Sequence, residues 1–250
     1  MSWRTRLRIV LIEPRNALNI GAAARAMLNF GFAELWLVDP WEEAFRNAKS
    51  AMGAREVLAR ARVTADRSEA LGEASLVVGT SAARGRATDL VERELPIAGG
   101  VLRTHLDERP AALVFGSEKF GLSRRDLSYC DWLLTIPTDP ECPSMNLGQA
   151  VAVCCYELSR RSQPVPERQP PVGLEAAERD RIVQLLLETL GRSGFLFADS
   201  VASQTRKLRR FVARLRLAPK DARMFQGMLR QILWRFEHPE EAPWSDPRNH

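Results

Sequence analysis

Residues 1–160 alternate short, continuous apolar runs with longer amphipathic stretches. The apolar runs are rich in valine, leucine and isoleucine and lie at 8–13, 35–38, 75–80, 112–116 and 132–136. Runs of this kind are typical of strands that are buried on both faces, which requires a parallel sheet covered by helices. The pattern therefore predicts an α/β fold, with a ligand crevice at the carboxyl ends of the strands.

Helices are predicted between these strands, at 20–29 and 51–61. A further helix at 146–158 is apolar on nearly every side, so it should be buried on several sides and is a natural subunit contact. Four prolines in 162–173 cannot continue a helix and predict a semi-rigid linker. The predicted boundaries are 1–161 for the α/β domain, 162–173 for the linker and 174–250 for a second domain.

The second domain carries helical stripes of apolar residues. One stripe covers 175–190 and is followed by Gly191, the predicted helix stop. Another covers 225–236 and follows Pro219, a residue that suits the first turn of a helix. A small all-helical domain is therefore predicted after the linker.

Positive charge is concentrated in this second domain. The whole chain has a net charge of +5, and residues 173–237 alone carry 13 Lys or Arg against 7 Asp or Glu. Within them, 203–216 has no acidic residue, and its basic side chains are Arg206, Lys207, Arg209, Arg210, Arg214 and Arg216. A solvated helix face normally mixes both signs of charge, so this run favours phosphate binding. We take the first five as candidate RNA-binding residues.

The three histidines and four cysteines limit the possible chemistry. They form no pattern of metal ligands, and no C-x-x-C pair is present. A Ser/His/Asp or Cys/His relay would have to rest on His105, because His238 and His250 lie near the carboxyl terminus. Neither a metal site nor hydrolysis by an enzyme nucleophile is therefore expected.

No apolar run approaches the ~20 residues that cross a bilayer. The amino terminus enters the first predicted strand without a signal-peptide core. A cytoplasmic protein without membrane contact is therefore expected.

A first candidate motif, in residues 13–31, directly follows the first predicted strand. Asn19, Gly21 and Arg25 stand at N-x-G-x-x-x-R spacing. Asn19 is placed to cap the helix, and Gly21 leaves room for close backbone approach. The dinucleotide fingerprint G-x-G-x-x-G is absent, because alanines follow Gly21. A tight helix–sheet contact with an exposed Arg25 is the competing interpretation.

Two further candidate motifs lie at the ends of predicted strands, one at residues 113–122 and one at residues 136–150. In residues 113–122 a strand ends at Gly116, and Glu118 follows, either as a site carboxylate or as a helix-start acid. In residues 136–150 a proline-rich loop leads to Ser144 and Asn146, which are also ordinary N-cap types. Each motif alone is weak.

Together and in this order, the three segments resemble motifs 1, 2 and 3 of the SpoU (TrmH) family of SPOUT RNA 2′-O-methyltransferases. The resemblance covers about residues 6–160 and has the endings N-x-G-x-x-x-R, F-G-x-E-x-x-G-L and S-x-N-L-x-x-A. The run at 77–86 and the basic stretch at 207–214 are similar to the TrmJ type of tRNA methyltransferase, which extends the resemblance to about residue 237.

The resemblance implies a trefoil-knotted α/β domain, S-adenosylmethionine as cofactor and a homodimer with active sites near the interface. It implies that the cofactor pocket is lined by Thr80, Ser81, Ala82, Gly116, Ile136, Ser144, Met145, Asn146 and Leu147. It assigns catalysis or its support to Arg25, Asn19, Glu118, Ser144 and Asn146. Ser117 departs from the pattern, since relatives often carry arginine there, and a phosphate contact is expected to be missing.

The implied reaction is 2′-O-methylation of cytidine or uridine in tRNA, with position 32 of the anticodon loop as the expected target. Methyl transfer from a sulfonium needs placement of the ribose oxygen and help with its proton rather than an enzyme nucleophile. Because a guanidinium stays protonated, we expect Arg25 to anchor a phosphate and to stabilise charge on the 2′-oxygen.

Three alternatives remain open. The substrate could be rRNA, or the chain could be a catalytically silent RNA-binding protein of the same fold. A nicotinamide-dependent oxidoreductase ranks last, because its phosphate-binding fingerprint is absent.

Overall fold

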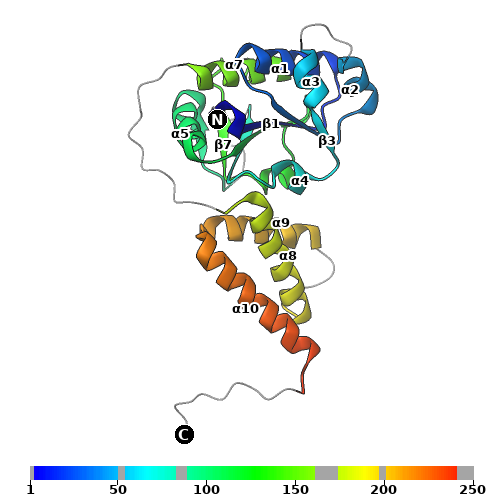
Figure 1. Ribbon diagram of the computed structural model, residues 1–250, viewed down its shortest axis with the longest axis vertical. Coiled ribbons are helices and arrows are strands. Elements are labelled where there is room, and N and C mark those ends of the chain that lie inside the picture. Colours follow the sequence, from blue (N-terminus) through cyan, green and yellow to red (C-terminus); the bar gives the residue numbers. More distant parts are fainter. Residues whose placement is uncertain (1–2, 50–53, 83–88, 161–173, 197–200, 241–250) are drawn as a thin grey trace.

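The computed structural model describes residues 3–49, 54–82, 89–160, 174–196 and 201–240 (Figure 1). Within them, seven strands form one sheet in the order β3-β2-β1-β6-β4-β7-β5, and every pair is parallel. The strands are β1 Leu7–Ile12, β2 Glu34–Val38, β3 Arg62–Thr64, β4 Leu76–Ser81, β5 Glu92–Glu94, β6 Ala111–Phe115 and β7 Trp132–Thr135. The predicted parallel sheet is confirmed.

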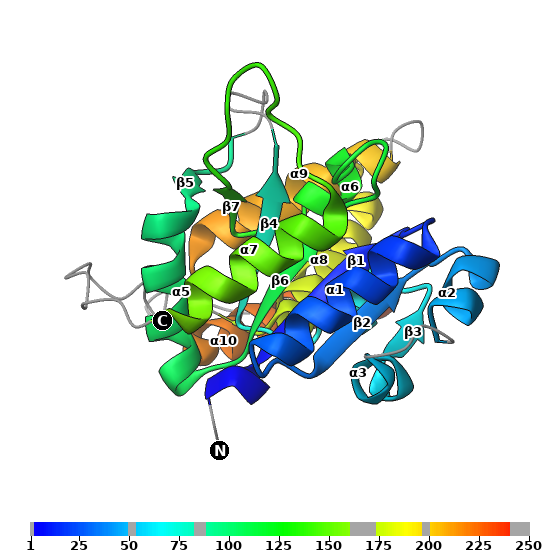
Figure 2. The same ribbon diagram turned by 90° about the horizontal axis from the view of Figure 1, so that it is seen from above.

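Helices cover both faces of this sheet (Figure 2). The helices of the α/β part are α1 Ala17–Asn29, α2 Glu42–Lys49, α3 Arg55–Arg60, α4 Arg67–Leu71, α5 Leu95–Glu108, α6 Arg124–Leu127 and α7 Leu147–Ser159, after a short 3-10 turn at Trp3–Arg6. In Figure 2, α1, α7 and α5 lie side by side over one face. The opposite face is covered by α4, α6 and the start of α8.

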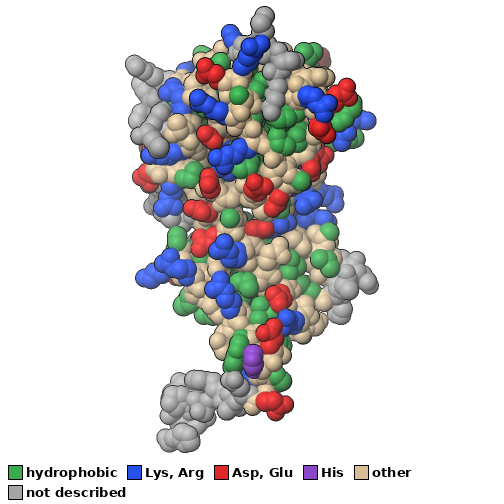
Figure 3. All heavy atoms as spheres, turned by 45° about the vertical axis from the view of Figure 1, so that its right-hand side comes forward, with side chains coloured by type: hydrophobic (Ala, Val, Ile, Leu, Met, Phe, Trp, Pro, Cys, Tyr) green, Lys and Arg blue, Asp and Glu red, His purple; other side chains and the backbone are tan. Residues whose placement is uncertain are grey.

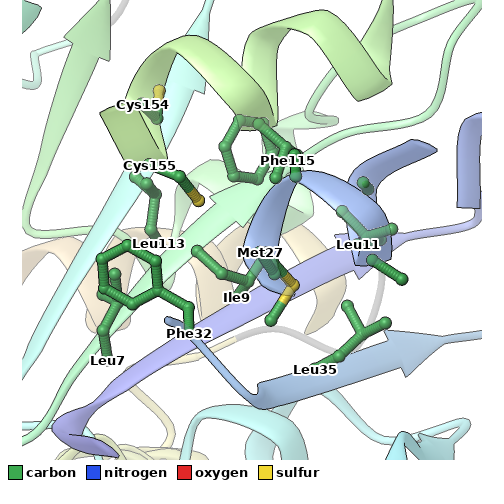
Figure 4. Packing of buried hydrophobic residues seen from close by; sticks show 14 of the residues in the cluster. Leu7, Ile9, Leu11, Met27, Phe32, Leu35, Leu113, Phe115, Cys154 and Cys155 are labelled. Carbon is green, nitrogen blue, oxygen red and sulfur yellow. The ribbon is translucent and has the colours of Figure 1, made fainter. Parts of the chain in front are cut away.

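Alternation along each strand divides the core between these two faces. Leu7, Ile9 and Leu11 of β1 pack under α1 and α7, together with Met27 and Phe115 and others shown in Figure 4. Val10 and Ile12 point to the other face. Each fully buried aliphatic side chain of this kind contributes about 1.5–3 kcal/mol. Burial on both faces is why these strands are apolar without interruption.

The two short edge strands of the sheet have no continuous apolar run. The sequence pattern missed β3 and β5, which lie at the two edges of the sheet and are partly exposed. Charged side chains at an exposed edge discourage pairing with other chains, so such strands carry no apolar run. The helix predicted at 51–61 starts only at Arg55, and residues 50–53 lie outside the described residues.

The carboxyl-terminal region is helical, as predicted. It contains α8 Ala176–Arg192, α9 Val201–Leu215 and α10 Pro219–Glu237, which share a core that includes Ile182, Leu186, Val212 and Leu229. Pro219 opens α10, as predicted. Gly191 does not end α8, because the helix continues to Arg192 and Gly194, at φ +78°, takes the left-handed position.

Polar contacts attach this helical region to the α/β part. The Ala176 N–H donates to the carbonyl of Ala74 at 2.9 Å, and the hydroxyl of Ser68 donates to Asp180 at 2.8 Å. The linker predicted at 162–173 lies outside the described residues, so the three predicted domain boundaries stay a prediction. Every helix in the described part is too short or too polar to cross a bilayer.

Candidate functional site

A cavity of about 490 Å³ lies at the carboxyl ends of β4, β6 and β7, where the sequence pattern predicted a crevice. It is lined by all the residues predicted for the cofactor pocket, namely Thr80, Ser81, Ala82, Gly116, Ile136, Ser144, Met145, Asn146 and Leu147. Asn19 and Glu118 line it as well. We call it the carboxyl-end cavity.

The lining also includes residues that were not predicted for the cofactor pocket, among them Phe115, Lys119, Phe120 and Leu134. Phe120 is 71% exposed, and the Lys119 ammonium lies 5.1 Å from its ring centroid. An aromatic residue between Gly116 and Gly121 was the available sequence signal.

One chain of hydrogen bonds joins the three motifs at this cavity. The Asn19 Nδ2 donates to Glu118 Oε1 at 3.1 Å, and the Asn146 Nδ2 donates to Asn19 Oδ1 at 2.8 Å. The Asn146 Oδ1 in turn accepts from the N–H groups of Gly148 and Gln149, at 2.9 and 3.3 Å. Asn146 is therefore both the N-cap of α7 and a member of the site.

Asn19 does not have its predicted capping role. The N-cap of α1 is Asn16, whose side chain accepts from the Leu18 N–H at 2.8 Å. Asn19 lies in the first turn of the helix and is only 8% exposed. Because Asn16 satisfies the helix end, the Asn19 amide is available to link Glu118 to Asn146.

Glu118 acts as an acceptor for the amino end of α1. Its carboxylate accepts from the backbone N–H groups of Arg15 and Asn16, each at 3.1 Å, besides the Asn19 amide. Burial raises the pKa of Glu118, but these hydrogen bonds and that of its own N–H outweigh it, so the pKa lies below its usual value. An ionised Glu118 positions the first motif and is a poor proton acceptor.

Arg67 also helps to hold the turn between β1 and α1, which precedes Asn19. Arg67 is 5% exposed and donates to Asp126 at 2.5 Å and to Glu13 at 2.9 Å. Glu13 adopts φ +49°, an unfavourable conformation for a residue with a Cβ. The buried guanidinium therefore holds the turn that leads from β1 into α1.

Two glycines permit close approach at the site. A Cβ on Gly116 would lie 2.0 Å from the carbonyl carbon of Gly121, so only glycine fits there. A Cβ on Gly148 would lie 2.6 Å from the Cβ of Ala22, which shows how closely α7 approaches α1. Ser117, the residue that departs from the family pattern, accepts through its carbonyl from the Gly121 N–H at 2.8 Å and closes the same turn.

Arg25 does not line the cavity of its own chain. It lies on the exposed side of α1 with Ala22, one turn before it, and Leu18, two turns before it. Leu18 is 79% exposed, and Tyr156 of α7, whose ring lies 6.0 Å from that of Phe30 at the end of α1, is 54% exposed. The described residues therefore bring together every predicted catalytic residue except Arg25.

The candidate RNA-binding residues of α9 fall into two groups. Figure 3 shows Lys and Arg side chains on both parts of the molecule. Arg209 is 11% exposed, donates to Asp180 at 2.7 and 2.9 Å and lies 4.1 Å from the Tyr129 ring, so it is engaged within the chain, and its RNA-binding role stays a prediction. Arg210 pairs with Asp89 at 3.1 Å. Arg206, Lys207 and Arg214 have no ion-pair partner within the described chain.

Comparisons with known proteins agree with this geometry. The sequence matches the SpoU rRNA Methylase family over residues 6–156. It is 33% identical over 244 residues to the tRNA (cytidine/uridine-2′-O-)-methyltransferase TrmJ of Yersinia pestis (strain Pestoides F), covering 94% of this chain and 95% of the relative. It is 35% identical over 238 residues to TrmJ of Cronobacter sakazakii, covering 90% and 95%. The fold is similar to the crystal structure of TrmJ from Z. mobilis ZM4, with a TM-score of 0.77, 29% identity and coverage of 90% and 98%.

Proposed function

The chain belongs to the SpoU rRNA Methylase family, and we propose that it methylates the ribose 2′-oxygen of cytidine and uridine in tRNA, at position 32 of the anticodon loop. The chain is a TrmJ-like tRNA methyltransferase. The observation that carries its chemistry is the hydrogen-bond chain Glu118–Asn19–Asn146, which joins the three motifs at one cavity.

The helical region favours tRNA over rRNA. The family match ends at residue 156, before α8, whereas the tRNA-modifying relatives cover 90–94% of the chain and therefore include the helical region. Nucleoside mapping of tRNA from cells with and without the protein tests this choice. We expect 2′-O-methylcytidine and 2′-O-methyluridine at position 32 to disappear from tRNA, with rRNA as the unchanged control. Loss confined to rRNA would contradict the proposal.

The carboxyl-end cavity fits S-adenosylmethionine. Its volume lies within the range of small-molecule sites, and it combines apolar side chains such as Leu134 and Leu147 with strand-end backbone at Thr80–Ala82 and Gly116. When bound, this cofactor supplies an electrophilic methyl group. The residues that would hold S-adenosylmethionine are those predicted for the cofactor pocket, all of which line this cavity.

Gly116→Ala tests this assignment. The added Cβ would overlap the backbone at Gly121 and displace the cavity wall, so we expect affinity for S-adenosylhomocysteine to fall by at least about tenfold in calorimetry. Gly191→Ala is the matched control, because a Cβ there meets no atom within 4 Å. The wild-type protein should bind S-adenosylhomocysteine and not NAD. Tight binding of NAD alone would overturn the assignment.

The chain's residues contribute placement and electrostatics to the reaction. Glu118, Asn19 and Asn146 fix the loops that would hold the ribose oxygen in line. A guanidinium is a cationic hydrogen-bond donor, so Arg25 stabilises developing charge on the 2′-oxygen and anchors the adjacent phosphate. A phosphate oxygen of the RNA takes the proton.

A homodimer would bring Arg25 to a cavity. Leu18, Ala22 and Arg25 form an exposed row on α1, and Tyr156 of the adjacent α7 is exposed as well. Exposed apolar side chains such as Leu18 and Tyr156 are typical of a contact surface. In a two-fold dimer through this face, the same surface meets itself. Arg25 of one subunit would then serve the cavity of the other.

Leu18→Glu is expected to convert the dimer to monomers at micromolar concentration, because the new charge would be buried in the contact. A glutamate in the first turn of α1 suits the helix, so the fold should persist. Ile97→Glu is the control, since Ile97 is 52% exposed in the first turn of α5. Sedimentation of both variants measures their oligomeric state. A wild-type protein that is active as a monomer would contradict the proposed homodimer.

A further inference from the structure

Another cavity, of about 670 Å³, lies between the α/β part and the helical region. The α/β part contributes Ser75 and Leu76 at the amino end of β4 and Trp132 at the amino end of β7. Among the described residues, it shares no lining residue with the carboxyl-end cavity. β4 has six residues, so the two cavities lie at opposite ends of a strand about 17–20 Å long.

The helical region completes the wall of this interdomain cavity. It contributes Arg179 of α8, together with Arg210, Arg214 and Arg216 of α9 and the segment after it. Two ion pairs, Arg179–Asp131 and Arg210–Asp89, cross from this region to the α/β part beside the cavity. The cavity therefore has a defined shape that depends on both parts of the chain.

The interdomain cavity is cationic. Of its described lining residues, five are arginine and two are aspartate, and both aspartates are already paired with Arg179 and Arg210. Arg214 and Arg216 have no ion-pair partner within the described chain. Unpaired positive charge in a concave site concentrates anions.

Arg179 lines this cavity and is fixed by its contact with Asp131. Its Nη1 donates to Asp131, whereas its Nη2 is buried and has no hydrogen-bond partner among the described residues. Arg179 therefore helps to hold Asp131 in the cavity wall, and contact with an anion falls to the exposed Arg214 and Arg216.

A simple anion would leave much of the wall unused, because apolar side chains form the other part of it. They are Leu76, Val91, Val101, Trp132, Leu174, Val212 and Leu217. The Arg93 guanidinium lies 5.5 Å from the Trp132 ring centroid, and guanidinium planes and aromatic rings are the groups on which nucleobases stack. The fitting ligand has a flat body and a phosphate.

We propose that the interdomain cavity is a second nucleotide-binding site, which holds one phosphorylated nucleotide apart from the nucleotide that is methylated. The proposed function enters only in naming tRNA as the expected source of this nucleotide. A nucleotide bound here lies at the opposite end of β4 from the carboxyl-end cavity. It would fix the position of the RNA on the enzyme.

Two variants of the full-length protein test the site. Ala213→Phe fills the cavity without changing charge, and Arg214→Gln/Arg216→Gln removes its unpaired charges. Their controls are Ala202→Phe and Lys220→Gln/Arg223→Gln, which make the same changes at exposed positions outside the cavity. The probes are labelled tRNA, titrated at several salt concentrations, and AMP in equilibrium dialysis with saturating S-adenosylhomocysteine.

We expect both cavity variants, and neither control, to weaken tRNA binding by about tenfold. The double arginine variant should also lower the salt slope by about one phosphate contact relative to its control. AMP binding lost in both variants while tRNA affinity stays at the control value would support the site with a free nucleotide as its ligand. If neither probe distinguishes the cavity variants from their controls, the proposal is overturned. Failure of S-adenosylhomocysteine to bind would count against the proposed function alone.

Discussion

Arg25→Ala is expected to slow methyl transfer to tRNA by about 10²- to 10³-fold, while affinity for S-adenosylhomocysteine stays within about twofold. Arg25 lies outside the cavity of its own chain, so its loss should leave the contacts to the methyl donor intact. Its proposed contacts are to the RNA phosphate and the reacting oxygen. Single-turnover kinetics and calorimetry measure the two effects separately.

In the proposed homodimer, mixing two variant chains tests which subunit's cavity Arg25 serves. Combining Arg25→Ala with Gly116→Ala chains should restore about a quarter of wild-type activity, because half of randomly mixed dimers are heterodimers with one complete site. Arg60→Ala, an exposed arginine on α3, is the control for charge loss. Full activity of Arg25→Ala would refute the role of the first motif, and failure to complement would place Arg25 at its own chain's cavity.

Glu118→Gln is expected to reduce kcat by about 10²-fold, because it disturbs the loop that positions Asn19 and Asn146. A glutamine offers one acceptor oxygen where the carboxylate offers two, so at least one of the N–H groups of Arg15, Asn16 and Asn19 loses its partner. Glu141→Gln, outside the cavity, is the matched control. The pH–rate profile should keep its shape, whereas loss of a limb would identify Glu118 as a proton acceptor.

The same variant has a pH-dependent effect on stability. The pKa of Glu118 is lowered in the folded state, so its contribution is complete above the ordinary glutamate pKa and disappears as pH falls through the folded value. Because the side chain is exposed, we expect a difference of only about 1 kcal/mol in the free energy of unfolding at neutral pH. Urea denaturation should show this difference shrinking below about pH 4.

The sequence by itself determined the fold class and the family to which the three motifs belong. Apolar runs indicate burial on both faces, so β1, β2, β4, β6 and β7 were predictable, whereas β3 and β5 were not, because edge strands carry charge. The motif spacings identified the family, which the comparisons confirm. Asn146 was correctly placed at a helix start, since capping is a local interaction.

The tertiary structure alone decided which side chains meet. The order β1-β6-β4-β7 brings Asn19, Glu118 and Asn146 together, although no local pattern specifies strand order. It also turned Arg25 away from its own cavity and paired Arg209 with Asp180, 29 residues away. Local periodicity reports how deeply a residue is buried, but the partner of a polar group depends on long-range packing. For that reason the interdomain cavity, which is lined by residues from 75–132 and from 174–217, had no signature in the sequence.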